Sequence, residues 1–156
     1  MFILGIDPGS HQIGYGLIKT GRKTELLRSG LLKFQKRGAE NLKDIYDCVY
    51  ALMESTKPGV VAIERIFFFK NQKTVIEVAQ SRGVILLAAM KHKLKIIEIA
   101  PLQVKLSIAG SGRADKKAIA KMTARILGVS KIEGADDVTD AIALALTAAQ
   151  LLRYPQ

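Results

Sequence analysis

The sequence predicts an α/β domain in which a five-stranded mixed β-sheet carries helices on both faces. Three strand-like segments follow one another at the start of the chain, and helix-like and strand-like segments alternate after them. Hydrophobic residues make up 49% of the 156 residues, which is enough for a sizeable core. Gly and Pro residues are scattered rather than clustered in a linker, so we expect residues 1–156 to form one domain.

The first three strands are expected before residue 35. Residues 2–6 form a short apolar run that a Pro-Gly pair ends, and residues 13–19 show strand-like alternation close enough to pair with it as a hairpin. Residues 24–34 favour a third strand, in which we expect Gly30 to mark a bulge.

The middle of the chain alternates between helix and strand. Residues 41–55 place apolar side chains at helical spacing and are stopped by a second Pro-Gly pair. Residues 60–63 are a short β-branched run typical of a buried strand. A long helix with a heavily apolar second half is expected over residues 73–91, and residues 94–99 predict the fifth strand.

The last third is expected to be helical. Pro101 is typical of the first position of a helix, and residues 110–112 (GSG) indicate a loop. A basic helix is expected over about residues 116–127, and a final Ala/Leu-rich helix over about residues 136–152.

Four carboxylates stand out as candidate metal ligands. Asp7 and Glu64 each follow a short apolar run, and a carboxylate at the end of a buried strand needs a partner or a metal ion. Asp137 and Asp140 are three residues apart on a helix, which places their Cβ atoms roughly 5–6 Å apart on one face. If the strand ends meet that helix, four hard oxygen donors surround one cavity, and such a cavity suits Mg²⁺ or Mn²⁺.

Structural explanations compete with metal binding at each acid. Asp7 before Pro-Gly could close an Asx-turn, and Glu64 could pair with Arg65. Acids in a first helical turn also favour the helix dipole, and we expect Asp136 to cap the last helix. A cap explains one acid of the group but not three, so we assign Asp137 and Asp140 to the metal site.

The net charge indicates a polyanionic substrate. Lys and Arg number 24 against 14 Asp and Glu, which gives a formal charge of +10. A basic protein with an acidic metal cluster is suited to phosphodiester chemistry on nucleic acid.

Three consecutive aromatic residues, at positions 67–69, follow Glu64 closely. They cannot all face one core, so at least one is expected to face solvent or a ligand. Arg65 and Lys70 flank the run, and this combination suits base stacking beside phosphate contacts, although a role in the core or in a dimer interface is expected for at least one ring.

A second basic segment precedes and enters the helix expected at residue 116. Its Lys and Arg residues at i, i+4 spacing could track phosphates or form an ordinary solvated helix face. The segment consists of Arg113, Lys116, Lys117, Lys121 and Arg125.

Composition also bears on the compartment. The single cysteine, Cys48, excludes a disulfide framework, and the N-terminus has no basic region typical of a signal peptide. The longest apolar runs are shorter than a membrane span. We therefore expect a cytoplasmic protein with no membrane association.

Five short segments, in one order from residue 3 to about residue 147, resemble RuvC-type Holliday junction resolvases. Each motif alone is weak, but five in order are specific. The matching segments are residues 5–10 with 14–16, residues 62–64 followed by Phe67, Lys70 and Asn71, residues 80–83, residues 103–105, and residues 137–143.

The resemblance implies an RNase H-like fold, a homodimer, and endonuclease activity on four-way DNA junctions. It implies Asp7, Glu64, Asp137 and Asp140 as the metal-binding catalytic acids, with two Mg²⁺ ions per site that Mn²⁺ can replace. It also implies Phe67 as a base-stacking residue. It further implies that Lys105 and Lys116 contact DNA near the scissile phosphate and that Asn71 is another DNA contact. A junction-migrating helicase complex is a candidate partner.

Some assignments stay open. Asp136 directly precedes Asp137, so a one-residue shift would exchange them, and Lys117 directly follows Lys116. The rival enzyme classes are the RNase H-like nucleases of ribosomal RNA processing and the actin and sugar-kinase type of ATPase, which needs a second domain. A catalytically inactive junction-binding protein is a third alternative.

Overall fold

A computed structural model describes residues 1–36, 38–65 and 72–153, with residues 72–74 described by their backbone alone. Five strands form one mixed sheet in the order β3-β2-β1-β4-β5. In one half of the sheet, β1, β2 and β3 pair antiparallel to one another in sequence. In the other half, β4 and β5 lie parallel to β1. The strands are β1 (Phe2–Asp7), β2 (Gln12–Lys19), β3 (Glu25–Lys33), β4 (Val60–Glu64) and β5 (Lys95–Ile99).

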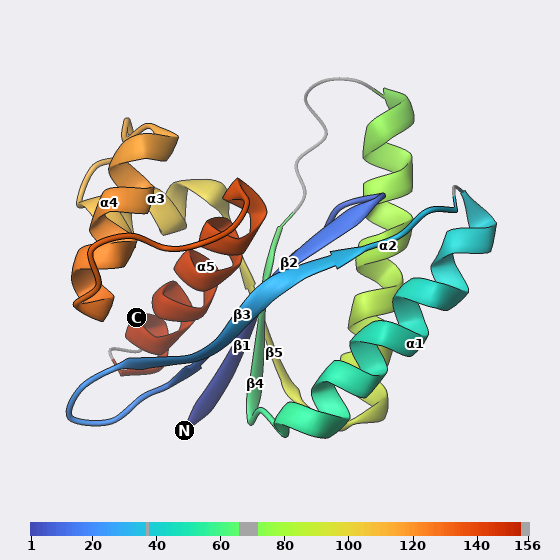
Figure 1. Ribbon diagram of the computed structural model, residues 1–156, viewed down its shortest axis with the longest axis horizontal. Helices are drawn as coiled ribbons and strands as arrows, with labels where there is room; N and C mark the ends of the chain where they lie inside the picture. Colours follow the sequence, from blue (N-terminus) through green and yellow to red (C-terminus); the bar gives the residue numbers. More distant parts are fainter. Residues whose placement is uncertain (37, 66–71, 154–156) are drawn as a thin grey trace.

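Helices cover both faces of this sheet, as the sequence predicts. Figure 1 shows the sheet nearly edge-on, with α1 and α2 on one side and α3, α4 and α5 on the other. Each side has its own hydrophobic core, centred on Ile45 and Ile85 on the first face and on Ile142 on the second. The helices are α1 (Ala39–Thr56), α2 (Gln72–Lys91), α3 (Pro101–Ala109), α4 (Lys116–Leu127) and α5 (Asp136–Arg153).

Local signals explain where several helices begin and end. Pro101 occupies the start of α3, where its missing N–H is not needed. The side chain of Asp115 caps α4 by accepting a 2.7 Å hydrogen bond from the backbone N–H of Ala118. Gly128 ends the same helix in a left-handed conformation with a φ of 71°.

Helix α5 lies unusually close to the sheet because glycines face it. A Cβ atom added to Gly5 of β1 would overlap the backbone carbonyl of Ala141, and one added to Gly14 of β2 would overlap that of Asp137. Only glycine permits this approach, since any side chain would push the helix outward. The contact fixes the first turn of α5 against the ends of β1 and β2.

The expected bulge lies elsewhere in β3. Gly30 pairs regularly with Tyr15, whereas the register shifts where Leu17 faces Arg28 and Ile18 faces Leu26, so the extra residue is Leu27. The prediction of a bulge at Gly30 is therefore wrong. Gly30 instead leaves room for the Tyr15 ring, whose hydroxyl would lie 2.8 Å from an added Cβ atom.

Helix α2 divides its apolar residues between two faces. Ile85 and Ala89 are fully buried against the sheet, and Leu86 packs against the same core. Val78 on the same face is half-buried, so most of the apolar side chains of this face belong to the core.

The opposite face of α2 carries the exposed residues Ile76, Gln80, Gly83, Leu87 and Met90. Their spacing of four, three, four and three residues forms one continuous stripe along the helix. We call these five residues the α2 stripe. No helix within the described ranges is long and apolar enough to cross a membrane.

Candidate active site

Two of the four candidate acids lie at the same edge of the sheet. Strands β1 and β4 are adjacent and parallel, with Ile6 opposite Ile63. Asp7 and Glu64 are the last residues of these strands. Both residues are half-buried, as expected for acids that end central strands.

Helix α5 brings the other two acids to this edge. Asp137 and Asp140 lie in its first and second turns and are half-buried, whereas Asp136 is exposed. Because the carbonyl of Asp137 rests against Gly14, which pairs with Asp7 across the hairpin, α5 starts directly beside the end of β1.

A cavity of about 260 Å³ collects three of the acids and two lysines. Asp7, Glu64 and Asp140 contribute carboxylates, and Lys105 of α3 and Lys116 of α4 line the same space. An anionic group entering this cavity would therefore meet positive charge on the side of α3 and α4. The remaining lining residues are Pro101, Val104, Ala114, Asp115, Ile119 and Leu144.

A second hollow lies on the other side of Asp7. It measures about 460 Å³ and is lined by Asp7, Asp137 and the turn from Pro8 to Gln12. The Nε2 amide of Gln12 donates a 2.6 Å hydrogen bond to Asp137 Oδ2 and so fixes this carboxylate. Asp7 is thus the one acid that lines both hollows, and Asp137 rather than Asp136 accompanies it.

Burial and the neighbouring negative charges raise the pKa values of Asp7, Glu64 and Asp140. Burial is the largest cause for Asp7, and the negative charges of Asp140, Glu64 and Asp137 add to it, so that the pKa of Asp7 rises from 3.8 to about 8. Burial and then Asp140 raise the pKa of Glu64. Burial also raises the pKa of Asp140, although Lys116 opposes that rise.

Lys116 supplies the nearest positive charge to the acids. Its Nζ atom lies 3.4 Å from Asp140 Oδ2, and this neighbour raises the pKa of the lysine. Lys117 is exposed and does not line the cavity. The geometry therefore places Lys116, and not its neighbour, beside the acids.

The donor set fits a hard divalent cation. Carboxylate oxygens are the ligands that Mg²⁺ and Mn²⁺ prefer, and a cation would relieve the repulsion that raises the pKa of Asp7. Within residues 1–36, 38–65 and 72–153, no three Asp, Glu, His or Cys side chains are already gathered as a metal-binding group.

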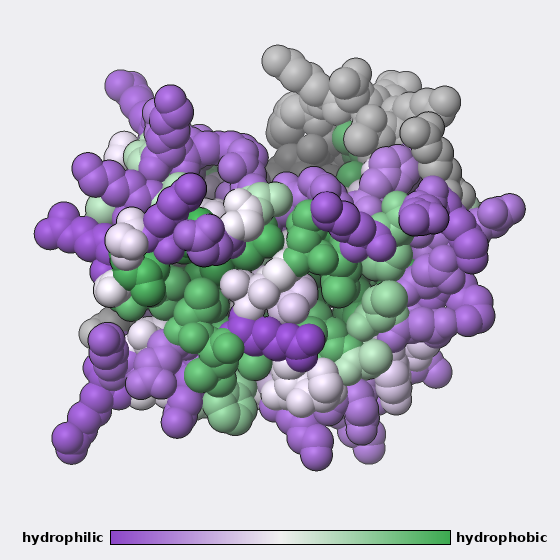
Figure 2. Space-filling view, in the orientation of Figure 1, coloured by the Kyte–Doolittle hydropathy of each residue, from purple (hydrophilic) through white to green (hydrophobic). Residues whose placement is uncertain are grey.

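The predicted DNA-contacting residues are only partly described. Arg65 is exposed directly after β4, and Arg113 is exposed in the turn before α4. Figure 2 shows hydrophilic side chains along the outer edge over α4. Phe67, Lys70 and Asn71 lie outside the described residues, as do the two phenylalanines that follow Phe67.

Three supporting residues were missed by sequence reasoning. Gln12 holds Asp137, and the buried Asn41 donates a 2.6 Å hydrogen bond from Nδ2 to the carbonyl of Ser10 in the turn after Asp7. Arg82 of α2 donates to the carbonyl of Glu64 at 3.0 Å. The Gln-x-Arg-Gly segment marked Arg82 as noteworthy, but its partner is visible only in three dimensions.

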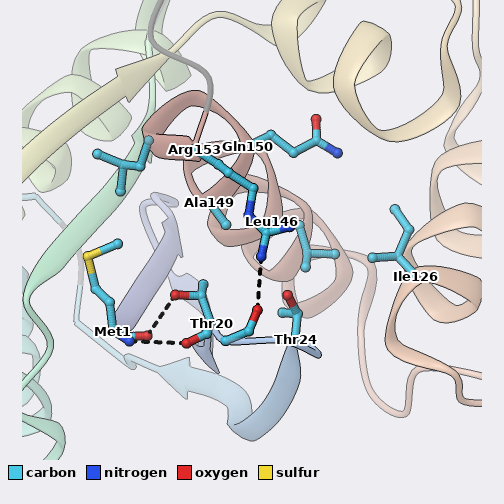
Figure 3. Close-up of a pocket in the computed structure, with 10 residues that line it drawn as sticks. Met1, Thr20, Thr24, Ile126, Leu146, Ala149, Gln150 and Arg153 are labelled. Atoms are coloured by element: carbon cyan, nitrogen blue, oxygen red, sulfur yellow. Dashed lines mark hydrogen bonds between the residues drawn. The ribbon is translucent and has the colours of Figure 1, made fainter.

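A third cavity lies away from these acids. It measures about 560 Å³ and is formed between the start of β1, the turn after β2 and the last turns of α5 (Figure 3). Met1, Thr20 and Arg153 line it, and no carboxylate is among its lining residues. It offers neither the acids nor the lysines that phosphodiester chemistry requires.

The order of strands, the two helical layers and the acids at the strand ends define a nuclease of the RNase H-like class. The fold of the yeast mitochondrial Holliday junction resolvase Ydc2 agrees, with a TM-score of 0.69 at 15% identity over 97% of this chain and 80% of that one. At this level of identity the likeness concerns the fold alone.

The chain belongs to the family described as crossover junction endodeoxyribonuclease RuvC, whose model matches residues 3–148. The RuvC of Natranaerobius thermophilus is 41% identical over 156 residues, which cover 98% of this chain and 97% of that protein. The RuvC of Fusobacterium nucleatum is 42% identical over 150 residues, covering 94% of this chain and 79% of that protein.

A solved structure agrees with this assignment. Thermus thermophilus RuvC in complex with its Holliday junction substrate superimposes with a TM-score of 0.91 at 31% identity, covering 98% of this chain and 95% of that one. The predicted fold class and enzyme class are therefore confirmed: the chain is a Holliday junction resolvase of the RuvC family. The two enzyme rivals considered from sequence are excluded by this result.

Proposed function

We propose that residues 1–156 act as one nuclease domain that binds four-way junction DNA in the cytoplasm and resolves it by paired symmetric nicks. The observation that carries this proposal is the position of Asp7, which lines one hollow with Glu64 and Asp140 and another with Asp137. The complex of the Thermus relative with a Holliday junction supports the choice of substrate. A junction-migrating helicase complex remains a candidate partner.

Asp7, Glu64, Asp137 and Asp140 would hold two Mg²⁺ ions, with Mn²⁺ as a substitute. Asp7 is suited to bridge the ions because it lines both hollows, whereas Glu64 and Asp140 share only the first and Asp137 only the second. When bound, the ions supply Lewis acidity that activates a water and stabilises the leaving oxygen of the phosphodiester.

The two cavity lysines would bind the scissile phosphate. Lys105 and Lys116 face the acids from α3 and α4 across the same cavity. Lys116 is charged and already beside Asp140, so it can move a short distance to a phosphoryl oxygen and offset developing negative charge. Arg65, Lys70 and Asn71 would also contact the DNA, and Arg113 and Lys117 would extend a positive surface along α4.

A nicking assay tests this function. Wild-type protein should cut a four-way junction into paired nicked duplexes with Mg²⁺, and duplex DNA or structured RNA should stay intact. Glu64→Gln should bind the junction and fail to cut it. Junction binding without cleavage by the wild-type protein at any Mg²⁺ or Mn²⁺ concentration would instead identify the catalytically inactive binding protein.

A homodimer formed through the α2 stripe would supply the paired active sites. Its spacing resembles the seam of a two-helix interface, and Leu87 and Met90 are 49% and 67% exposed at its end. Gly83, in the middle, has no atom within 4 Å of an added Cβ and leaves room for a second helix. A two-fold dimer matches the symmetry of a four-way junction.

Leu87→Asp tests this interface against a matched control. Leu27 on β3 is 48% exposed, almost the same as Leu87, but lies on the edge strand of the sheet. By sedimentation the wild-type protein should weigh twice 17.0 kDa, and Leu87→Asp should weigh 17.0 kDa. Leu27→Asp should stay dimeric. A monomeric wild-type protein that still makes paired cuts would refute the interface.

Phe67 is the proposed stacking residue at the junction centre. Opening the centre unstacks bases, and an aromatic ring returns about 1–3 kcal/mol per base. Phe67→Ala should therefore cut intact junctions about 5- to 150-fold more slowly while a fluorescent base analogue reports less unstacking. If Phe67→Ala cuts normally and a change at Phe68 or Phe69 does not, another ring stacks.

A further inference from the structure

Arg82 connects helix α2 to the strand end that carries Glu64. Its Nε donates a hydrogen bond of 3.0 Å to the backbone carbonyl of Glu64, and its Nη2 pairs with the carboxylate of Glu98 on β5. The Arg82 side chain is only 16% exposed. A single guanidinium thus spans the ends of two neighbouring strands from the helix packed beside them.

The strand register explains why this is the point that needs support. Glu64 is the last residue of β4 and lies opposite Ile99 of β5, and the N–H of Arg65 makes one further bond to Ile99 at 2.8 Å. Regular pairing ends there. The carbonyl of Glu64 accepts from Arg82, so the Glu64–Arg65 peptide at the edge of the cavity is held by β5 through its N–H and by the Arg82 side chain through its carbonyl.

The charges around Glu64 add a second reason. Glu64 shares its cavity with Asp7 and Asp140, and like charges at short range push a flexible strand end apart. Arg82 does not line this cavity, so it does not neutralise the three acids at their carboxylates. Its contribution is mechanical, because it holds the backbone from which Glu64 projects.

We propose that Arg82 is a positioning residue that fixes the end of β4 and thereby aims the Glu64 carboxylate into the cavity shared with Asp7 and Asp140. This inference rests on the proposed role of Glu64. A guanidinium suits the task because its planar, rigid fork reaches two acceptors at once, whereas a lysine ammonium on a flexible stem does not hold both.

Arg82→Gln, Arg82→Lys and Glu98→Gln test the proposal. Supporting residues behind metal ligands typically change metal affinity or activity about 10–100-fold, so we expect Arg82→Gln to lower kcat by about that factor. The Mn²⁺ concentration that half-saturates thermal stabilisation of the DNA-free protein should rise about tenfold. Arg82→Lys should show an intermediate loss, and Glu98→Gln, which keeps an acceptor, a small one. Junction affinity in chelator should stay unchanged.

Arg153→Gln is the matched control. Arg153 also donates from Nη2 to a backbone carbonyl, that of Gly21 at 2.9 Å, but at the opposite end of the sheet (Figure 3). This variant should lose a comparable arginine–carbonyl bond and keep wild-type cleavage and Mn²⁺ dependence.

The outcomes separate the two levels of inference. If Arg82→Gln cuts and binds Mn²⁺ like wild type while Glu64→Gln is inactive, Arg82 has no positioning role. Arg82 likewise has no positioning role if Arg82→Gln and Arg82→Lys lose activity only in proportion to their loss of thermal stability. If Arg82→Gln does not fold, the cleavage rate and the Mn²⁺ dependence of Arg82→Lys and Glu98→Gln test the proposal instead. A fully active Glu64→Gln would instead overturn the proposed active site itself.

Discussion

Replacing Asp7 by asparagine should stabilise the metal-free protein while it abolishes cleavage. Burial, and then the charges of Asp140, Glu64 and Asp137, raise the pKa of Asp7 from 3.8 to about 8. Because this pKa is raised in the folded state, the stability that Asp7 contributes is fully present below pH 3.8 and is lost as the pH rises through about 8. At pH 7 the loss relative to a neutral side chain is at most about 4 kcal/mol, at 1.36 kcal/mol per pH unit.

Chemical denaturation in the presence of a chelator measures this difference. At pH 7 Asp7→Asn should be more stable than wild type by about 2–4 kcal/mol, and the gap should widen at pH 9 and narrow at pH 5. Added Mg²⁺ should stabilise the wild-type protein and not the variant. Asp7→Asn should also lose junction cleavage while it binds junctions normally, because the proposed bridging metal ligand is lost.

An exposed aspartate provides the control for this experiment. Asp47 pairs with Lys43 on the surface of α1, and exposed ion pairs contribute little, so Asp47→Asn should leave stability close to that of the wild-type protein. An Asp7→Asn variant that is less stable than wild type at pH 9 in chelator would refute the argument, because it would mean that the Asp7 carboxylate is already well compensated without a metal ion.

Three further substitutions address the geometry of the site. Gly14→Ala should destabilise the protein by about 1–3 kcal/mol and slow nicking, because the added Cβ overlaps the carbonyl of Asp137; Gly21→Ala, whose nearest atom lies 3.7 Å away, should leave both within error. Asp137→Asn should lower the nicking rate and Asp136→Asn should not, and the reverse result would shift the alignment by one residue. Lys116→Gln should slow nicking and raise the pKa of Asp140 in an NMR titration, because the lysine lowers it; an unchanged pKa would show that the two do not interact.

The elements of the fold were largely predictable because their signals are local. Apolar runs, helical periodicity and Pro or Gly at the ends predicted all five strands and the long helices, including the start of α4 at Lys116. The bulge was assigned to Gly30 because glycine often marks one, but the position of a bulge depends on pairing with a neighbouring strand. Leu27 takes the extra place, and Gly30 accommodates the ring of Tyr15.

Residues of the candidate site were predictable where the chemistry requires a particular residue type. They were not predictable where only a contact in the folded structure identifies the residue. Acids that follow buried strands stand out in a sequence, so Asp7 and Glu64 were found together with the pair on α5. Gln12 and Arg82 are common residue types whose partners lie 125 and 18 positions away in the chain, and no spacing rule connects them. For the same reason, the sequence alone did not show which face of α2 packs against the sheet and which face is exposed.

The order in which the site is assembled along the chain has a consequence during synthesis. Asp7 and Glu64 come from the first half of the sequence, but the helix that brings Asp140 to them is the last element of the fold. A nascent chain on the ribosome therefore lacks Asp137 and Asp140 until α5 has been synthesised. If the four acids act together as proposed, a nascent chain that lacks α5 cannot cut DNA.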